Sequence, residues 1–251
     1  MNLTIDIGNT NVMICIFKNN QIIKCDKINV INFSKNKQYY FFKKLFLKYK
    51  ILNVLISSVV PGISEKFFEI FDTLKVDFFK IKNLLRICNL KTSIRNKSSI
   101  GNDRLINIIY ARHLYEKSKV IIDFGTATTI DVLDKHGVYA GGVITPGIDL
   151  SLKSLQMGTA KLPLVSFKKT NEIVGKSTKE AIQSGFFWGY VSMIQGLTQK
   201  IQKEKKTKFK IILTGGNAKF FKGCFENVIK IDEYFNSKGL NYITNTYFKK
   251  L

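Results

Sequence analysis

The amino-acid sequence predicts a mixed α/β fold made of two related halves. Short apolar segments that suit buried strands alternate with longer segments whose apolar residues recur at helical spacing. The order strand, Asp-x-Gly turn, strand, turn, strand occurs near the start of the chain and again near its middle. A chain of 251 residues can form two cores. We therefore expect one half over residues 1–115 and the other over 116–251, with the boundary in the polar stretch around residues 112–119.

The repeated unit is visible in two stretches of similar design. Leu3–Thr10 and Val120–Thr128 both run from an apolar strand into Asp-x-Gly and a threonine. The second strands of the two copies are expected over Val12–Phe17 and Thr129–Leu133, and the third strands begin at Gln21 and Val138. Asn or Gly in the intervening turns tolerates positive φ. The duplication predicts two sheets of the same construction.

The remaining elements alternate along the chain. We expect helices over Tyr39–Tyr49, Ser64–Leu74, Gly101–Tyr115 and Thr178–Ile201, the last with candidate kink positions at Gly185 and Gly189. Further strands are expected over Asn53–Val60, Val76–Ile81 and Lys208–Leu213. Strands mixed with helices in this order favour mixed α/β sheets.

Composition excludes several classes of protein. The net charge is +22, but the lysines are scattered and no nucleic-acid-binding motif accompanies them, so we expect no nucleic-acid partner. No apolar run reaches the length of a membrane helix, and the first residues read as a strand and turn, so the cytoplasm is the expected location. The four cysteines form no C-x-x-C pair, which predicts neither a zinc site nor a disulfide framework.

The two Asp-x-Gly turns are the first candidate site. Gly8 and Gly125 let the backbone approach a phosphate, while Asn9, Thr10, Thr126 and Thr128 can donate hydrogen bonds to its oxygens. Asp6 and Asp123 can hold a cation or its water shell, and Mg²⁺ suits such sites because it keeps several waters. Two copies at matching places indicate a pair of turns that bind the phosphates of one nucleotide from opposite sides.

Two other glycine-containing segments are either ligand-binding features or ordinary turns. Thr214-Gly215-Gly216 follows an apolar strand and is either a plain turn or a surface for adenine or ribose. Gly175-Lys176-Ser177-Thr178 resembles the end of a P-loop, but the earlier glycine of that motif would fall at Thr170. A P-loop is therefore rejected.

Asp103 is the candidate proton acceptor. Gly101-Asn102-Asp103-Arg104 precedes an apolar helix, so Asp103 would lie in the first turn, either as a helix-capping carboxylate or as a base that orients an attacking hydroxyl. Arg104 could bind a substrate carboxylate in a bidentate pair. The glycine-rich stretch Gly141–Ile148 predicts a close approach of backbone to a ligand or to a second subunit.

Taken in order, these motifs resemble the type III pantothenate kinases of the acetate and sugar kinase/Hsp70/actin superfamily. The ordered series is Asp6-Ile7-Gly8-Asn9-Thr10-Asn11, Gly101-Asn102-Asp103-Arg104, Asp123–Asp131, Gly141–Gly147, Leu162-Pro163, Gly175-Lys176-Ser177-Thr178 and Thr214-Gly215-Gly216. The resemblance implies duplicated ribonuclease H-like, actin-like ATPase domains with a nucleotide cleft between them. It also implies ATP-dependent phosphorylation of pantothenate to 4'-phosphopantothenate, the first step of coenzyme A synthesis.

The resemblance assigns roles residue by residue. It implies ATP contacts from Asp6, Ile7, Gly8, Asn9, Thr10, Asn11, Val12, Met13 and Thr126, and pantothenate contacts from Gly101, Asn102, Asp103, Arg104 and Thr178. Asp103 is the implied base, and Asp123 the implied ligand of a monovalent cation, K⁺ or NH₄⁺, used beside ATP and Mg²⁺. Thr178 is similar to a threonine presented across a homodimer interface, which implies a dimer.

Some positions depart from the pattern. Asn102 replaces a small residue, Ile94 stands where many members have tyrosine, and Asn96-Lys97 replaces Asn-Pro. These changes affect the wall of the substrate pocket and leave the phosphate turns intact. Two alternative functions stay open. The chain could phosphorylate another small carboxylate-bearing metabolite, since fold does not fix substrate, or it could be a regulatory protein that binds ATP without catalysis.

Overall fold

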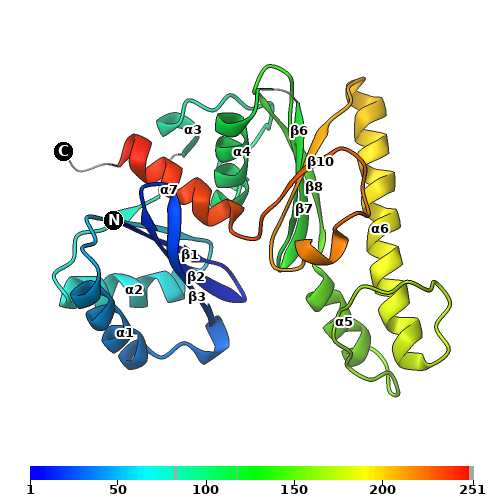
Figure 1. Cartoon of the computed structure of the whole chain (residues 1–251), viewed down its shortest axis with the longest axis horizontal. Coiled ribbons are helices and arrows are strands. Elements are labelled where there is room, and N and C mark those ends of the chain that lie inside the picture. The colour runs from blue at the N-terminus through cyan, green and yellow to red at the C-terminus, as the bar shows by residue number, and fades with distance from the viewer. Residues whose placement is uncertain (82–83, 117, 249–251) are drawn as a thin grey trace. The chain divides into compact units, whose positions relative to one another are not determined.

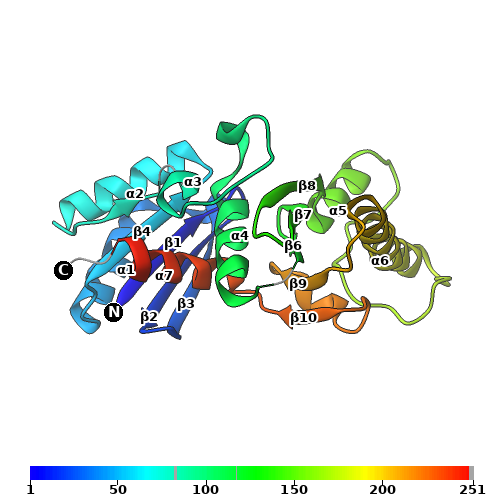
Figure 2. The ribbon, with the colours of Figure 1, turned by 90° about the horizontal axis from the view of Figure 1, so that it is seen from above.

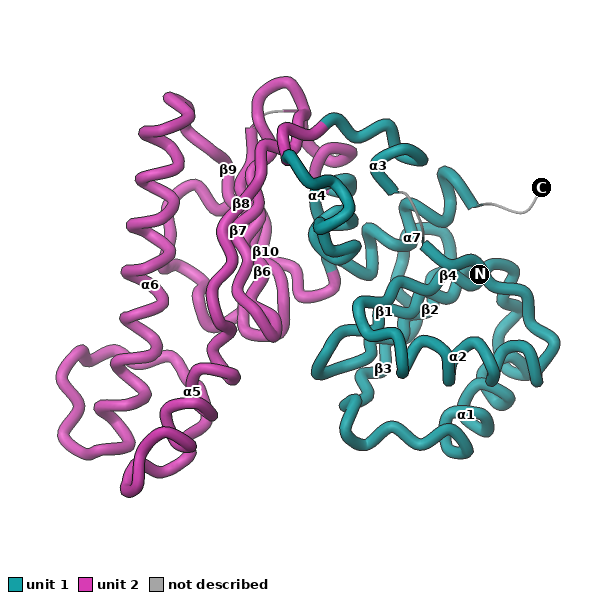
Figure 3. The backbone as a smooth tube through the Cα atoms, turned by 180° about the vertical axis from the view of Figure 1, so that it is seen from behind, with its two compact units in different colours: residues 1–91, 95–110, 235–251 teal, residues 92–94, 111–234 magenta. Residues whose placement is uncertain are grey.

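The computed structural model describes residues 1–81, 84–116 and 118–248 and divides into two compact units (Figure 3). Unit 1 comprises residues 1–91, 95–110 and 235–251, and unit 2 comprises residues 92–94 and 111–234. The end of the chain thus returns to unit 1, and the compact units are not the halves 1–115 and 116–251 that the sequence suggested. Those halves stay a prediction about the duplication, and Lys117, within the expected boundary, lies outside the described residues.

Unit 1 is built on a five-stranded mixed sheet. Its strand order is β3 (Gln21–Asn29), β2 (Asn11–Lys18), β1 (Asn2–Ile7), β4 (Asn53–Ser58) and β5 (Phe79–Lys80). The pairs β1–β2 and β2–β3 are antiparallel, whereas β1–β4 and β4–β5 are parallel. Figure 2 shows β1, β2, β3 and β4 side by side. Strand β5 is much shorter than the predicted Val76–Ile81.

Two helices cover one face of this sheet. Helices α1 (Lys35–Lys48) and α2 (Pro61–Thr73) pack Phe42, Phe67 and Phe71 against the apolar residues of β1, β2 and β4. Proline suits the first turn of α2 because its missing N–H would have no helical partner there. The rings of Phe42 and Phe71 lie 4.9 Å apart at 65°, a favourable edge-on geometry. This packing supports the strands that lead into the first Asp-x-Gly turn.

Helix α7 (Phe235–Tyr247) packs against β1, β2 and β4. Its contact includes a network of asparagines. The buried Asn2 donates to the Oδ1 atoms of Asn241 and Asn245 at 2.8 and 2.7 Å and accepts from Asn53 at 3.0 Å. Because these amides hydrogen-bond to one another, the bonds offset the cost of removing them from water, and the network fixes α7 on the sheet.

Unit 2 repeats the sheet of unit 1. Its order is β10 (Val228–Ile231), β9 (Lys210–Thr214), β6 (Lys119–Phe124), β7 (Ala127–Leu133) and β8 (Tyr139–Pro146). The antiparallel strands β6, β7 and β8 (Figure 1) correspond to β1, β2 and β3, and the parallel strands β9 and β10 correspond to β4 and β5. The predicted duplicated mixed α/β architecture is confirmed.

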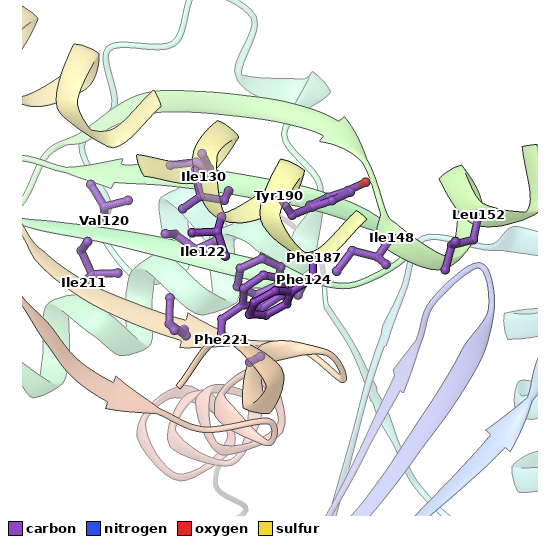
Figure 4. Close-up of a cluster of buried hydrophobic side chains, with 14 of the residues drawn as sticks. Val120, Ile122, Phe124, Ile130, Ile148, Leu152, Phe187, Tyr190, Ile211 and Phe221 are labelled. Carbon is purple, nitrogen blue, oxygen red and sulfur yellow. The ribbon is translucent and has the colours of Figure 1, made fainter. Parts of the chain in front are cut away.

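The core of unit 2 lies between this sheet and helices α5 (Ile148–Met157) and α6 (Thr178–Lys205). The rings of Phe124 and Phe221 stack at 4.3 Å, and Phe187 joins them from α6 (Figure 4). Phe124 is the residue between Asp123 and Gly125. Its packing in this stack therefore holds the second Asp-x-Gly turn against the core of unit 2. Helix α6 is one continuous element, and whether it kinks at Gly185 or Gly189 stays a prediction.

Most predicted elements are confirmed, with α4 (Asn102–Leu114) among them. Strand β10 and helices α5 and α7 were not predicted. The short elements α3 (Leu84–Ile87), η1 (Val30–Asn32), η2 (Lys97–Ser99) and η3 (Ala218–Phe221) complete the described structure. Among the described residues, no helix has the length and apolar character to cross a membrane.

The sequence predicted no disulfide framework, but one pair of cysteines in the described structure is bonded. Cys15 on β2 and Cys25 on β3 form a disulfide between directly opposed positions. A regular hairpin through the Asn19-Asn20 turn would pair Cys15 with Lys24. An irregularity between Ile16 and Phe17 shifts the register by one residue and brings the two cysteines opposite each other. Cys88 and Cys224 are free thiols.

Candidate active site

The first Asp-x-Gly turn joins β1 to β2 in unit 1. Ile7 pairs with Val12, and the Gly8 N–H donates to the carbonyl of Asn11 at 3.0 Å, which closes the turn over residues 8–11. A Cβ on Gly8 would lie 3.2 Å from that carbonyl, so the close turn favours glycine. Asn9 at the tip is exposed, while Asp6 and Thr10 are partly buried. Every residue of the predicted ATP segment, Asp6 to Met13, thus lies on this strand–turn–strand unit.

The second turn joins β6 to β7 in unit 2. Phe124 pairs with Thr128, and the Gly125 N–H donates to the carbonyl of Ala127 at 3.2 Å. Gly125 and Thr126 are exposed. The hydroxyl of Thr128 is buried and has no hydrogen-bond partner within the described structure. The predicted pair of Asp-x-Gly turns therefore exists as two similar backbone features, one in each unit.

Two glycines from later segments enclose the second turn. A Cβ on Gly147 would lie 2.2 Å from the carbonyl oxygen of Thr126, and a Cβ on Gly215 would lie 2.4 Å from Oδ1 of Asp123. The backbone φ of Gly215 is +87°, a conformation that residues other than glycine rarely adopt. The carboxylate of Asp123 consequently lies beside Gly125 and Gly215, and the predicted Thr214-Gly215-Gly216 segment belongs to the same site as the second turn.

Asn217 and Asp149 extend this group. The Asn217 amide donates to Oδ2 of Asp149 at 3.3 Å, and the Asn217 N–H donates to the Phe124 carbonyl at 3.5 Å. Asp149 lies in the first turn of α5, directly after Gly147. The sequence interpretation missed both residues, although Pro146-Gly147 at the end of a glycine-rich strand was a usable signal for a close approach.

Asp103 lies at the start of α4 in unit 1, as predicted. A Cβ on Gly101 would lie 2.4 Å from Oδ1 of Asp103, so the carboxylate folds over the bare Cα of that glycine. The Asn236 amide of α7 donates to the Asp103 carbonyl at 2.9 Å and to Oδ1 of Asn107 at 3.2 Å. Helix α4 is thus held by α7 at the turn that carries Asp103, and Gly101, Asn102 and Arg104 share that turn.

Thr178 is the first residue of α6 in unit 2 and is exposed. The side chain of Ser177 caps the helix by accepting from the Glu180 N–H at 3.2 Å, and the Glu180 carboxylate accepts from the Lys176 N–H at 2.9 Å. The Gly-Lys-Ser-Thr segment is therefore a helix cap. Thr178 lines a mainly apolar cavity of about 510 Å³ with Pro146 and Tyr190 among others.

Tyr190 connects this cavity to α5. Its hydroxyl donates to the carbonyl of Pro146 at 2.8 Å. The same hydroxyl lies 3.1 Å from the hydroxyl of Ser151. Burial raises the pKa of Tyr190, and the nearby Asp149 carboxylate acts in the same direction. Tyr190 therefore stays neutral near pH 7 and acts as a hydrogen-bond donor.

The described residues include no cluster of three or more His, Cys, Asp or Glu side chains suited to a metal. Such a cluster is not required for Mg²⁺, which uses one or two carboxylates and several waters. Asp123, beside Gly125 and Gly215, offers one carboxylate in unit 2. Asp6 provides the corresponding carboxylate in unit 1.

Comparison with known protein structures identifies the architecture. A protein from Campylobacter jejuni described as belonging to the Baf family of transcriptional activators shares 20% identity with a TM-score of 0.62, covering 97% of both chains. A 2-dehydro-3-deoxygalactonokinase from Sinorhizobium meliloti superposes with a TM-score of 0.60 at 10% identity, covering 100% of both chains. The fold is that of the actin-like ATPases and sugar kinases.

Sequence comparison identifies the family. The type III pantothenate kinase family model matches residues 2–200. A type III pantothenate kinase from Ehrlichia canis is 35% identical, covering 98% of this chain and 96% of its own, and one from Ehrlichia ruminantium is 34% identical, covering 99% and 100%. A third, from Desulforapulum autotrophicum, is 35% identical over 98% and 97%. The chain belongs to the type III pantothenate kinase family.

Proposed function

We propose that this chain transfers the γ-phosphoryl group of ATP to the primary hydroxyl of pantothenate, producing 4'-phosphopantothenate in the first step of coenzyme A biosynthesis. The carrying observation is the duplicated Asp-x-Gly turn at the end of equivalent strands, together with the Gly101–Arg104 segment, in a chain of the type III pantothenate kinase family. Phosphoryl transfer depends mainly on positioning and charge neutralisation. These turns offer backbone N–H groups, hydroxyls and carboxylates for both tasks.

In this proposal, the segment Asp6 to Met13 and Thr126 bind the phosphates of ATP. The exposed Asn9 and Thr126 lie at the tips of their turns, where their side chains can donate to phosphate oxygens. Gly215 lies directly against Asp123 and Phe124, so the Gly215-Gly216 segment adjoins the second turn, and in the proposal this segment contacts the adenosine portion. One nucleotide would then contact both turns.

Asp103 is the proposed proton acceptor for the pantothenate hydroxyl. Its carboxylate is partly buried and lies over Gly101, and its backbone is fixed by Asn236. Arg104, in the same helical turn, is the proposed anchor of the pantothenate carboxylate, because a guanidinium binds a carboxylate through two parallel hydrogen bonds. Gly101 and Asn102 complete this side of the substrate site.

Two cations belong to the proposal. Mg²⁺ would neutralise the phosphates of ATP, with Asp6 as its protein ligand in unit 1, directly or through water. Asp123 would bind a monovalent cation, K⁺ or NH₄⁺, because its carboxylate lies beside Gly125 and Gly215, where carbonyl groups can approach an ion.

The proposed active form is a cytoplasmic homodimer in which Thr178 contacts pantothenate across the interface. The support is the exposed position of Thr178 beside a largely apolar cavity, together with family membership.

The Cys15–Cys25 disulfide is of a kind that is uncommon in a reducing compartment such as the cytoplasm. Thiol alkylation of protein taken directly from cells would measure its redox state.

The test is a phosphoryl-transfer assay of the purified protein with ATP, Mg²⁺ and K⁺ and a panel of acceptors. We expect phosphate on pantothenate and at least about tenfold lower kcat/KM for other hydroxy acids and for neutral sugars. Preference for another carboxylate-bearing acceptor would make the chain a kinase of that metabolite. ATP binding without transfer to any acceptor would favour a regulatory role, and either result would overturn the proposal.

A further inference from the structure

Asp131 on β7 is a buried carboxylate that the proposed reaction does not use. It is 1% exposed, and no other Asp or Glu side chain of the described residues is buried to this degree. Removing a carboxylate from water is costly unless hydrogen bonds compensate the loss, and an apolar side chain at this position would avoid that cost. The presence of Asp131 inside a strand therefore needs an explanation.

Two hydroxyl groups bind this carboxylate. The Tyr139 hydroxyl donates to Oδ1 at 2.5 Å, a distance typical of a hydrogen bond to a charged acceptor, and the Thr129 hydroxyl donates to Oδ2 at 3.3 Å. Tyr139 is fully buried, and Thr129 is 8% exposed. Because a carboxylate only accepts hydrogen bonds, both hydroxyls direct their protons at Asp131.

A bulge in the sheet aims Tyr139 at Asp131. Strands β7 and β8 pair regularly as far as Val132, where an irregularity shifts the register by one residue. The shift places Tyr139 opposite Leu133, and so on the face of the sheet that also carries Asp131. Gly141, beside the irregularity, has φ of +108°, a conformation that favours glycine. Without the shift the tyrosine would lie on the other face, so the bulge is what makes this hydrogen bond possible.

The backbone of Tyr139 is fixed as well. The Thr92 hydroxyl and the Ser93 N–H both donate to the Tyr139 carbonyl, at 2.9 and 3.0 Å. On β8, the residue directly opposite Asp131 is Gly142, which has no side chain to compete for space beside the carboxylate. The pair of Tyr139 and Asp131 is therefore a fixed part of the sheet of unit 2.

The same face of the sheet leads from Asp131 to Asp123. Thr129 lies directly opposite Asp123 in the antiparallel pair of β6 and β7, where opposed side chains share a face with their Cβ atoms about 4.5–5.5 Å apart. Asp131 is two residues farther along β7 and so lies on that face too. Since the Thr129 proton is given to Asp131, the Thr129 oxygen can only accept on its other side. An oxygen of that kind suits a cation.

We propose that Asp131 is a positioning residue of the cation site at Asp123. By taking the Thr129 proton, it turns the lone pairs of the Thr129 oxygen toward the cation, and the hydrogen bond from Tyr139 holds the carboxylate in place for that task. This inference rests on the monovalent cation of the proposed function and extends it to side chains outside the proposed contacts with ATP and pantothenate.

Cation binding can be measured without turnover. An ion that binds only the folded protein stabilises it as the ion concentration rises, so urea unfolding in increasing KCl, with choline chloride keeping ionic strength constant, gives an apparent K⁺ affinity. We expect Asp131→Asn to weaken this affinity by about tenfold or more, because the new amide can donate to Thr129 and turn its proton toward the cation. Glu226→Gln removes the same charge from an exposed position of unit 2 and should leave the affinity unchanged. An unchanged K⁺ affinity in a folded Asp131→Asn protein would overturn the proposal.

Kinetics separates positioning from a general packing defect. If Asp131→Asn loses only K⁺ affinity, saturating K⁺ should restore kcat/KM for ATP to within about twofold of the natural chain. A packing defect would persist at every K⁺ concentration. A loss of kcat/KM that added KCl does not reduce would therefore contradict the positioning role.

Variants of Thr129 give a second test, which also applies if Asp131→Asn does not fold. Thr129→Val lacks the oxygen and should weaken K⁺ binding about as much as Asp131→Asn, whereas Thr129→Ser keeps the hydroxyl and should retain most of the affinity. If Asp131 acts through Thr129, the double variant should lose less than the product of the two single losses. Full K⁺ affinity in Thr129→Val, or single losses that simply multiply, would overturn the proposal.

The outcomes also distinguish this inference from the kinase activity. A natural chain that phosphorylates pantothenate but gains no stability from K⁺ would remove the cation from Asp123, and the role of Asp131 with it. A chain that K⁺ stabilises, with the gain reduced in Asp131→Asn, yet that phosphorylates no acceptor, would support the role of Asp131 and overturn the kinase proposal alone.

Discussion

The two Asp-x-Gly turns show which parts of the site are repeated and which were added to one copy. The first turn spans residues 8–11 between the paired Ile7 and Val12, while the second spans only residues 125–127 between Phe124 and Thr128. At the end of the neighbouring parallel strand, unit 1 has Ser58, whose hydroxyl accepts from the Val60 N–H at 3.0 Å. Unit 2 has Gly215 at the equivalent place, against Asp123.

This difference between the two turns indicates that the two units have different roles in the proposed reaction. The tightly enclosed second turn is suited to fixing an ion and the nucleotide, since Gly147 and Gly215 leave it little freedom. The first turn has no glycine at the position equivalent to Gly215, and α4 of the same unit carries Asp103. Three predictions test this division of roles in order of expected effect, and a fourth concerns the stability of the two sheets.

The largest effect should come from Asp103→Asn. If the turns bind phosphates and α4 handles the proton, this change should lower kcat about 100- to 10,000-fold and leave ATP affinity within about twofold. Steady-state kinetics and calorimetric ATP binding measure the two quantities. Asp72→Asn, at an exposed position in α2 of the same unit, is the control and should keep full activity. Near-normal turnover of Asp103→Asn would remove Asp103 from the role of base.

Gly147→Ala tests the enclosure of the second turn directly. The added methyl would lie 2.2 Å from the Thr126 carbonyl oxygen, so the turn must move. We expect ATP affinity to fall by about tenfold or more and stability to drop by about 1–3 kcal/mol. Gly8→Ala, with 3.2 Å available, should have a smaller effect, and Gly196→Ala, with open space in α6, should raise stability slightly. Equal losses in Gly8→Ala and Gly147→Ala would end the distinction between the turns.

Replacing K⁺ by Na⁺ should reduce ATP use severalfold, because the smaller ion fits a site formed for K⁺ at Asp123 less well. Asp123→Asn should remove this ion dependence, whereas Asp6→Asn should keep it. The measurement is kcat/KM for ATP in each salt at constant ionic strength. Identical rates in the two salts would count against a monovalent cation at Asp123.

The fourth prediction concerns the first residues of the equivalent strands, Asn2 and Lys119. Asn2 is buried within a network of amides, whereas burial lowers the pKa of Lys119 from 10.5 to about 8, only partly offset by Glu116. Near pH 7 folding must bury a charged lysine, so Lys119→Met should raise the free energy of unfolding by about 1–3 kcal/mol.

The pH dependence of that effect follows from the direction of the shift. Between pH 8 and 10.5 the unfolded chain binds more protons than the folded one at Lys119, so stability of the natural chain should rise over this range. The advantage of Lys119→Met should therefore shrink as pH rises. Urea denaturation at several pH values measures both curves, and parallel curves would contradict the account of Lys119.

Local patterns predicted much of this molecule, and non-local pairing explains what they missed. The Asp-x-Gly turns and their strands were predictable because apolar runs and turn residues adjoin in the chain. Helix α7 was missed because its buried face includes Asn241, whose partners lie at the opposite end of the sequence. The Cys15–Cys25 bond depends on a one-residue register shift that no local pattern reveals.

The same limit applies to the candidate active site: motifs within one segment were predicted, whereas contacts between distant segments were not. Asp103 and Asp123 were found because each lies in a recognisable motif, and their positions on α4 and β6 agree with it. The stretch with Gly147 was predicted to approach a ligand or a second subunit, but its contact with the second turn, and that of Asn217, was missed because both reach the turn from distant segments.

The most direct test of the central claim is a crystal structure with a non-hydrolysable ATP analogue, Mg²⁺ and K⁺. The account predicts that phosphate oxygens of a single nucleotide lie within hydrogen-bond distance of both the Asn9–Thr10 turn and Thr126. A nucleotide that contacts one turn while the other stays remote from every phosphate would contradict it.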